Sequence, residues 1–399
     1  MLISLVGVLL IAAVLLDAFL TVLDANGRSL FSAWAYRWFW WFWRHLARLV
    51  PPDRTHRMLS FGAPLMIPMM IGLWTGGLVV GFALLYFGGL EPQDALAGSQ
   101  SEADFANAFR LSFVTLSTIG FVEISPSNMA YSVTVALEAI LGSILITLSV
   151  TYYLSVHDAV AAYGRLVTGM QHRMPDADRP LSAAAAFLKH GSASDLSAWL
   201  GTLHDGTADL HEGLRRYPIV YYFRPLARRR GLPQTLAALR ETAAGLLWHL
   251  PRRHPLASSP ALAALQAALQ DLTGDLADRH VPVRRRTIAR PVDPGAFAAA
   301  FHGRLYAPDA WVERFLRERA AARELLDAVI PEDATSAYED YRGWLGFVVP
   351  LHDFERAMRA DLSYAERFRP GRSSSILSVI ARGPKDRPQP LERVREIQP

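Results

Sequence analysis

The chain contains no cysteine among its 399 residues. This absence excludes disulfide bonds, thiolate metal sites and cysteine nucleophiles. Lysine is nearly absent too, with Lys189 and Lys385 as its representatives, so arginine carries almost all of the positive charge. Such usage is typical of a GC-rich genome and is only a weak indication of phosphate recognition. The formal net charge of +4 is small, so the distribution of charge along the chain is more informative than its total.

Charged residues are also missing from three long stretches. Residues 58–90 carry none, residues 125–156 are interrupted only by Glu138, and residues 1–23 carry a single charge at Asp17. Runs of about 20 or more apolar residues are typical of transmembrane helices. The first run lacks a basic leading region and a small-x-small cleavage site, so we expect a retained helix and not a secretory signal. The pattern predicts an all-α membrane protein.

The arginines predict the topology of these spans. The segment 24–60 is rich in arginine, whereas the segment 91–127 begins with acidic residues. Loops rich in arginine stay on the cytoplasmic side. We therefore expect the N-terminus outside, residues 24–60 inside, residues 91–127 outside, and the chain after about residue 157 in the cytoplasm. The expected location is the inner (cytoplasmic) membrane.

The inner segment contains an aromatic-dense stretch, AWAYRWFWWFWRHLARL, at residues 33–49. Tryptophan and tyrosine favour the headgroup level, and arginine favours the anionic inner leaflet. This pattern predicts an amphipathic helix in the membrane interface, with membrane lipids, including anionic ones, as partners. The alternative is an additional helix that is buried against the bundle.

A shorter helix is predicted between the second and third spans. Residues 104–117, DFANAFRLSFVTLS, carry apolar side chains at helical spacing. A helix of this length spans about 20 Å, which is too short to cross a bilayer. Non-helical backbone at membrane depth is tolerated only where it is buried in protein or lines water. The segment TLSTIGFVEISP that follows, at residues 115–126, is therefore expected to be buried in protein or to line water.

This segment resembles the selectivity filter of potassium channels. FVTLSTIGFVEISP is similar to their pattern T-[VI]-G-[YF]-G-D-x-x-P, with Thr118 to Phe121 matching and Pro126 in register. Gly142 falls where two-helix channels carry the hinge glycine of the inner helix. The resemblance covers about residues 60–157. More loosely, the whole chain resembles bacterial potassium-channel-like proteins with an extra N-terminal helix and a helical cytoplasmic tail.

The resemblance implies a tetrameric pore-loop cation channel. Because this chain holds one such loop, it implies a homotetramer around one pore. In these filters backbone carbonyls and a threonine hydroxyl replace the hydration shell of K⁺. The implied ion-binding residues are Thr118, Ile119, Gly120, Phe121 and Val122.

Val122 replaces the second glycine of the filter pattern. A β-branched residue at positive φ is an outlier, so we expect Val122 to adopt ordinary φ and to alter the outermost ion site. Three outcomes stay open: a selective pore, a poorly selective pore that also passes Na⁺, or a closed pore.

Other polar residues are predicted to support the filter and line the pore. Glu123 replaces the aspartate that follows the filter, and Arg110 stands where the family often has an aromatic donor. A pair between Arg110 and Glu123 would brace the filter; the alternative is that Arg110 reaches the outer surface. Glu138 is expected behind the filter as a hydrogen-bonding support, and Asp17 as a brace near the inner end of its span. The predicted pore-lining hydroxyls recur every four residues: Ser143, Thr147, Thr151 and Ser155.

The second half of the chain is polar and helical in pattern. It contains no GxGxxG motif after a strand, no Walker motif and no HExxH, and no catalytic constellation is visible. We therefore predict neither an enzyme nor a cofactor other than the permeant cation. His204, His211 and Glu212 are a weak metal candidate. Basic clusters at 224–231, 251–254 and 283–290 fit the anionic leaflet better than nucleic acid, and no nucleic-acid partner is expected.

The expected function is a tetrameric K⁺-conducting channel. The alternative is a non-conducting, membrane-anchored oligomeric scaffold or sensor on a channel-derived frame. The predicted divisions are an N-terminal transmembrane helix at 1–23, an interfacial aromatic and basic helix at 24–60, an outer pore helix at 61–90, a pore helix and filter at 104–126, an inner pore helix at 127–157, a helical cytoplasmic domain at 158–369 and a disordered tail at 370–399.

Overall fold

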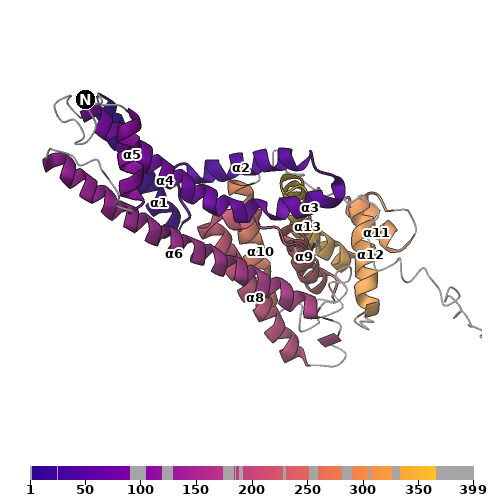
Figure 1. Cartoon of the computed structure of the whole chain (residues 1–399). Coiled ribbons are helices and arrows are strands. Elements are labelled where there is room, and N and C mark those ends of the chain that lie inside the picture. The colour runs from indigo at the N-terminus through magenta and orange to yellow at the C-terminus, as the bar shows by residue number, and fades with distance from the viewer. Residues whose placement is uncertain are drawn as a thin grey trace, which may run out of the picture. The chain divides into compact units, whose positions relative to one another are not determined.

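The computed structural model describes residues 2–24, 26–89, 105–118, 129–173, 184, 186–187, 192–227, 231–250, 259–280, 290–303, 307–325 and 333–364. Over these residues the protein is all-helical, without a strand (Figure 1). The chain divides into two units: the first holds Met1–Val167 and Asp205–Leu232, and the second holds Thr168–His204 and Pro233–Pro399. The predicted tail at 370–399 lies outside the described residues.

Two antiparallel helices, α1 (Leu2–Leu23) and α4 (Gly62–Gly89), form the centre of the first unit. Glycines let them approach closely: a Cβ at Gly7 would lie 2.6 Å from the carbonyl oxygen of Gly81. Small residues at helix interfaces are typical of membrane bundles, where close packing takes the place of hydrophobic association. Together with the third long helix, these segments are long and apolar enough to cross a membrane: Leu2–Leu23, Asp53–Gly89 and Met129–Arg173.

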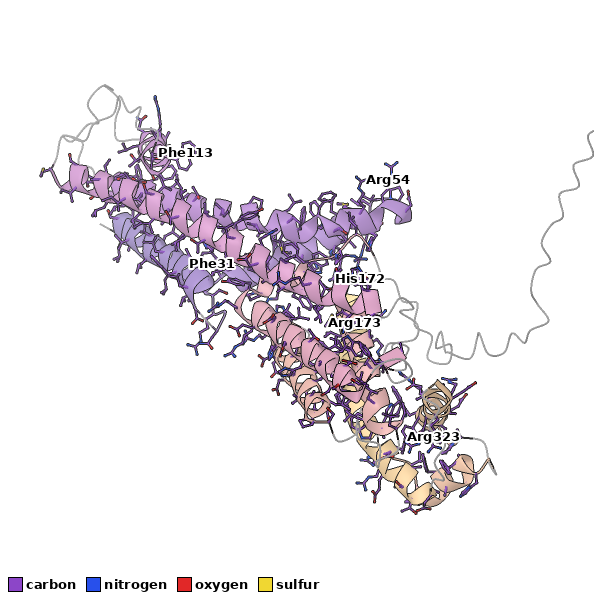
Figure 2. All side chains as sticks on the ribbon, turned by 90° about the horizontal axis from the view of Figure 1, so that it is seen from below. Phe31, Arg54, Phe113, His172, Arg173 and Arg323 are labelled. Carbon is purple, nitrogen blue, oxygen red and sulfur yellow. The ribbon has the colours of Figure 1, made fainter. Side chains whose placement is uncertain are left out.

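The arginine-rich segment 24–60 forms two helices, α2 (Ser32–Ala47) and α3 (Pro52–Ser60), in place of the one helix expected from the sequence. Pro51 and Pro52 separate them, since a proline cannot continue a preceding helix but starts one well. Figure 2 labels Phe31 at the junction where the chain turns from α1 into α2.

The inner pore helix is longer than predicted. Helix α6 runs without a break from Met129 to Arg173, whereas the predicted end was residue 157 (Figure 2 labels its last residues, His172 and Arg173). The apolar run ends near residue 157, but this does not end the helix. The helix continues because no proline follows Pro126 until Pro175. From Met129 to residue 160, the residues that α6 buries form one stripe along it: Glu138, Gly142, Leu145, Ser149, Tyr152 and Val156. Further along the helix, α6 also buries Tyr163, Leu166, Val167 and Met170.

A segment from beyond the predicted boundary at 158 returns to the first unit. It comprises the second half of α8 (Ala193–Arg216) and the 3₁₀ helix η1 (Pro218–Tyr222). Helix η1 contacts α2 and α4 and buries apolar side chains there, because the aromatic stretch RRYPIVYYF supplies Ile219, Val220, Tyr221 and Tyr222. Residues 158–369, which the sequence predicts as one helical domain, are therefore divided between the two units.

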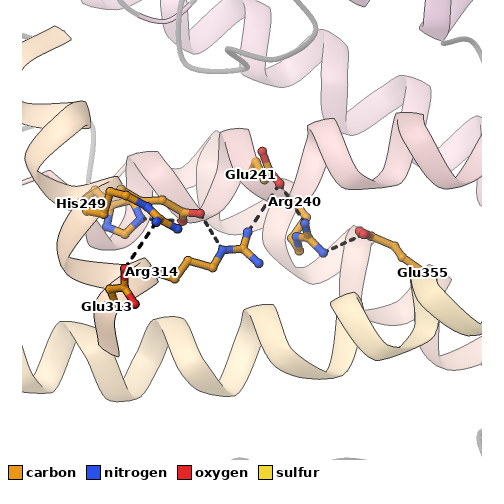
Figure 3. A network of polar contacts seen from close by, with 8 residues as sticks. Arg240, Glu241, His249, Glu313, Arg314 and Glu355 are labelled. Atoms are coloured by element: carbon orange, nitrogen blue, oxygen red, sulfur yellow. Dashed lines mark hydrogen bonds and ion pairs between the residues drawn. The ribbon is translucent and has the colours of Figure 1, made fainter. Parts of the chain in front are cut away.

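The second unit is built from α9 (Leu232–Trp248), α10 (Pro260–Arg279), α11 (Pro294–Phe301), α12 (Ala310–Leu325) and α13 (Ala334–Asp361). Buried ion pairs join these helices (Figure 3). Arg240 on α9 donates to Glu355 on α13 at 2.7 Å, and Arg319 on α12 donates to Asp340 on α13 at 2.9 Å. Removal of one partner from such a pair costs about 3–5 kcal/mol, because it leaves a buried charge unpaired.

Candidate pore site

Helix α5 (Phe105–Leu116) is the short helix predicted between the second and third spans. Its buried face consists of Ala108, Leu111, Ser112, Thr115 and Leu116. Ala108 and Leu111 pack with Phe82 and Tyr86 of α4, and Leu141 of α6 packs against this cluster. The helix is thus held between two long apolar helices, as a pore helix requires.

Glu138 on α6 is the polar centre of this packing. Its Oε2 accepts a hydrogen bond from the Tyr86 hydroxyl of α4 at 2.6 Å, and its Oε1 accepts one from the Ser112 hydroxyl of α5 at 2.5 Å. Ser112 Oγ also lies 3.0 Å from the carbonyl oxygen of Val79. A buried polar network of this kind specifies one arrangement of its helices. The predicted support at Glu138 thus has identified partners on both neighbouring helices.

Ser112 and Tyr86 were not identified as site residues from the sequence. Ser112 carries a visible signal, because a serine on the buried face of a short apolar helix needs a hydrogen-bond partner. Tyr86 carries none, because a tyrosine in an apolar span is as consistent with packing as with a polar role.

Gly142 contacts the C-terminal end of the pore helix. A Cβ at this position would collide with the carbonyl oxygen of Leu116, the last residue of α5. Helix α6 is continuous through Gly142. The close contact with Leu116 therefore explains why this position holds a glycine. The predicted hinge at Gly142 stays a prediction.

The pore helix ends in a left-handed residue. Ser117 N–H donates to the Phe113 carbonyl at 3.1 Å, Thr118 N–H donates to the Thr115 carbonyl at 3.0 Å, and Thr118 has φ of 57°. Threonine rarely adopts this region. Backbone outliers of this type gather at functional sites, and Thr118 is the first residue of the filter pattern.

The remaining filter residues, Ile119, Gly120, Phe121, Val122 and Glu123, lie outside the described residues. Arg110 is exposed on α5. The expected Arg110–Glu123 pair stays a prediction for this reason.

The hydroxyl row of α6 lies on the opposite side of the helix from its buried stripe, at 3.6 residues per turn. Ser143, Thr147 and Thr151 are exposed in the single chain, and Ser155 is half-buried. The first three hydroxyls donate to the carbonyl four residues earlier, at 3.3, 3.1 and 2.9 Å. These bonds satisfy the hydroxyl protons and leave oxygen lone pairs on an open helix face.

Asp17 joins three helices near the C-terminal end of α1. Its Oδ1 accepts from the backbone N–H of Leu30 and Phe31 at 2.7 and 2.9 Å, where α2 begins. Its Oδ2 accepts from the Ser32 hydroxyl and, at 2.9 Å, from Trp74 Nε1 of α4. A carboxylate at a helix N-terminus satisfies donors that the helix leaves open. These contacts agree with a bracing role for Asp17.

An aromatic cluster connects α6 to the elements beside it. The hydroxyls of Tyr36 on α2 and Tyr152 on α6 lie 2.6 Å apart, both buried. Trp74 contacts Tyr152 edge-on with ring centroids 5.8 Å apart, and Tyr217, just before η1, does so at 6.2 Å. The aromatic stretch RRYPIVYYF, at residues 215–223, thus contacts α6 directly through Tyr217. Over the part of the chain that the structure describes, no cluster of histidine and carboxylate residues is arranged to hold a metal ion.

The arrangement is that of a pore-loop module: two long membrane helices with a short helix held between them. A family model described as an ion channel matches residues 69–157, from within α4 through α5 to the middle of α6. The chain therefore carries an ion channel domain in an all-helical, multi-pass membrane protein. No curated protein and no solved structure matches the chain.

Proposed function

We propose that the chain is one subunit of a homotetrameric cation channel that conducts K⁺ across the cytoplasmic membrane. The observation that carries this proposal is the position of α5, which is fixed between α4 and α6 by the Glu138 network and ends at Leu116, two residues before Thr118. A pore helix fixed in this way can hold a filter at the axis of four subunits.

The permeant ion is bound by the filter residues 118–122, through carbonyl oxygens and the Thr118 hydroxyl. Val122 reduces the number of consecutive sites, so the channel discriminates less against Na⁺ than a filter with two glycines. The protein needs no further cofactor for this function, and ion conduction involves no enzymatic step.

The arginine-rich segment 24–60 faces the cytoplasm, where the arginines of α2 contact anionic lipids. The N-terminus and the α4–α5 connection then face the outside. The second unit is cytoplasmic.

The exposed hydroxyl row of α6 provides a direct test of the pore. Because the native chain has no cysteine, a Thr147→Cys variant carries a single thiol. We expect a charged aqueous thiol reagent to reduce ion flux through Thr147→Cys several-fold, because residue 147 lines the water-filled cavity. Ile146→Cys is the matched control, since Ile146 is also exposed in the single chain but lies about 100° around the helix. Equal sensitivity of both variants would contradict the assigned lining face.

A non-conducting scaffold or sensor is the second candidate, and Val122 is the residue that favours it. In that case the native protein shows no flux of either ion, and a Val122→Gly variant gains it.

A further inference from the structure

Helix α2 has two faces of different character. Ser32, Ala35, Tyr36, Trp40 and Ala47 are buried. On the opposite face Trp34, Trp38, Trp41 and Phe42 are 62, 54, 50 and 47 % exposed. Trp34 stacks on Trp38 with centroids 6.4 Å apart, and Trp38 stacks on Phe42 at 6.2 Å. We call these four residues the aromatic strip. A contiguous exposed patch of four large aromatic side chains marks an interaction surface.

The start of α2 lies at the depth of Asp17, because Asp17 accepts hydrogen bonds from the backbone of Leu30 and Phe31. Asp17 precedes the end of α1 by six residues, which is about 9 Å along the helix. Helix α1 is about 33 Å long at 1.5 Å per residue, close to the thickness of a bilayer's hydrocarbon core. Helix α2 therefore begins inside the hydrocarbon core, about 9 Å before its inner boundary.

The other end of α2 lies near the start of α4. Trp43 Nε1 donates to the carbonyl of Met58 at 3.1 Å, and a Cβ at Gly62 would lie 2.9 Å from ring atoms of Trp40 and Trp43. Because α2 begins near Trp74, through Asp17, and ends near Gly62, it descends along the inner half of α4. This course favours the alternative of a helix packed on the bundle over one that lies flat in the interface, and it leaves the aromatic strip uncovered.

The strip and its neighbours match the inner membrane surface in chemistry. Tryptophan concentrates at the headgroup level, and arginine favours an anionic leaflet. Arg37, Arg44 and Arg48 lie along the same segment. From Trp34 to Phe42 the helix rises by about 12 Å, which is the order of the interfacial layer on one side of a bilayer.

We propose that the aromatic strip of α2 binds the phospholipid surface of the cytoplasmic leaflet in a descending orientation, with Trp34 among the acyl chains and Phe42 toward the headgroups. The buried face of the same helix is hydrogen-bonded to the inner pore helix through Tyr36 and Tyr152. Lipid contact on one face is thus connected to the pore on the other.

The proposal rests on the membrane arrangement of the proposed function, but its test reads depth and not ion flux. Single cysteines at Trp34, Trp38 and Phe42 are labelled with a nitroxide in the full-length, otherwise cysteine-free protein, in vesicles of phosphatidylcholine and phosphatidylglycerol. Collision with oxygen, which enters the bilayer, is compared with collision with an aqueous nickel chelate. Arg54→Cys on α3, at a side chain that is 79 % exposed, is the control.

We expect the ratio of oxygen to nickel collisions to be highest at position 34, to fall through 38 to 42, and to be several-fold lower at 54. Nickel-dominated collisions at all three strip positions would mean a solvated face and would overturn the proposal. Low collision rates with both reagents would mean that another copy of the chain covers the strip, with the same consequence. Equal depth at all three positions would overturn the descending orientation. A silent channel with the expected depth gradient would refute the proposed function alone.

Discussion

Two residues, Thr118 after α5 and Gly142 on α6, lie close to the C-terminal end of α5 and determine its backbone contacts. Thr118 is held at φ of 57° where α5 ends, and Gly142 lets α6 approach the carbonyl of Leu116 two residues earlier. Helix α6 thus contacts the end of α5 two residues before Thr118, the first residue of the predicted filter. A change at Gly142 acts on this end of α5 through one backbone contact.

We expect Gly142→Ala to destabilise the pore module by about 1–3 kcal/mol, because the added Cβ collides with the backbone of Leu116. The measurement is thermal unfolding of the detergent-purified oligomer. Gly164→Ala is the matched control on the same helix, since a Cβ there meets nothing within 4 Å. It should leave stability unchanged or raise it by about 0.5–1 kcal/mol. Equal stability of both variants would show that α6 does not approach Leu116 closely.

Helices were more predictable than their contacts. The apolar runs predicted the membrane helices, and the all-helical class is confirmed, because hydrophobic length and spacing are local properties of the sequence. The polar partners of Glu138 and Asp17 could not be predicted, since Ser112, Tyr86 and Trp74 are distant in sequence and become neighbours only through packing. The return of η1 to the first unit was missed for the same reason: its aromatic residues fit many environments, and the structure buries them against α2 and α4.

The α12–α13 interface of the second unit predicts a dependence of stability on pH. His352 on α13 contacts Trp311 on α12 with ring centroids 5.5 Å apart. Burial, together with the nearby guanidinium groups of Arg240 and Arg314, lowers the pKa of His352 to about 4. The folded protein therefore keeps this ring neutral, while the unfolded chain protonates it below its ordinary pKa of about 6.5. The contribution of the neutral His352 to the free energy of unfolding is complete above pH 6.5 and is lost as the pH falls from 6.5 to 4.

We expect the native protein to lose roughly 3 kcal/mol more than His352→Gln between pH 6.5 and 4, at about 1.4 kcal/mol per pH unit. Urea unfolding of the full-length protein at several pH values, followed by tryptophan emission, measures this difference. Other titrating groups, such as Glu318 and Glu355, are common to both proteins and cancel in the comparison. His302→Gln, at an exposed histidine, should keep the native dependence. If His352→Gln shows the same slope as the native protein, this histidine is not the source of the dependence.

At the scale of the whole chain, further elements pack against the ion channel domain. Helix α2 is joined to α1 by Asp17 and to α6 by Tyr36, and Tyr217 before η1 contacts Tyr152. Helix α6 itself continues past the first unit into the second, up to Arg173. The ion channel domain is therefore covalently continuous with the second unit through α6, and it contacts α2 through Tyr152.

Ion flux through the purified protein in liposomes tests the central claim most directly. We expect a potassium gradient to drive flux well above that of protein-free liposomes, and Val122→Gly to increase the ratio of potassium to sodium flux because it restores the second filter glycine. Absence of flux for both ions in the native protein, with flux gained by Val122→Gly, would contradict a conducting channel and favour the scaffold. Absence of flux in both proteins, despite intact oligomers, would contradict the assignment of residues 118–122 as an ion filter.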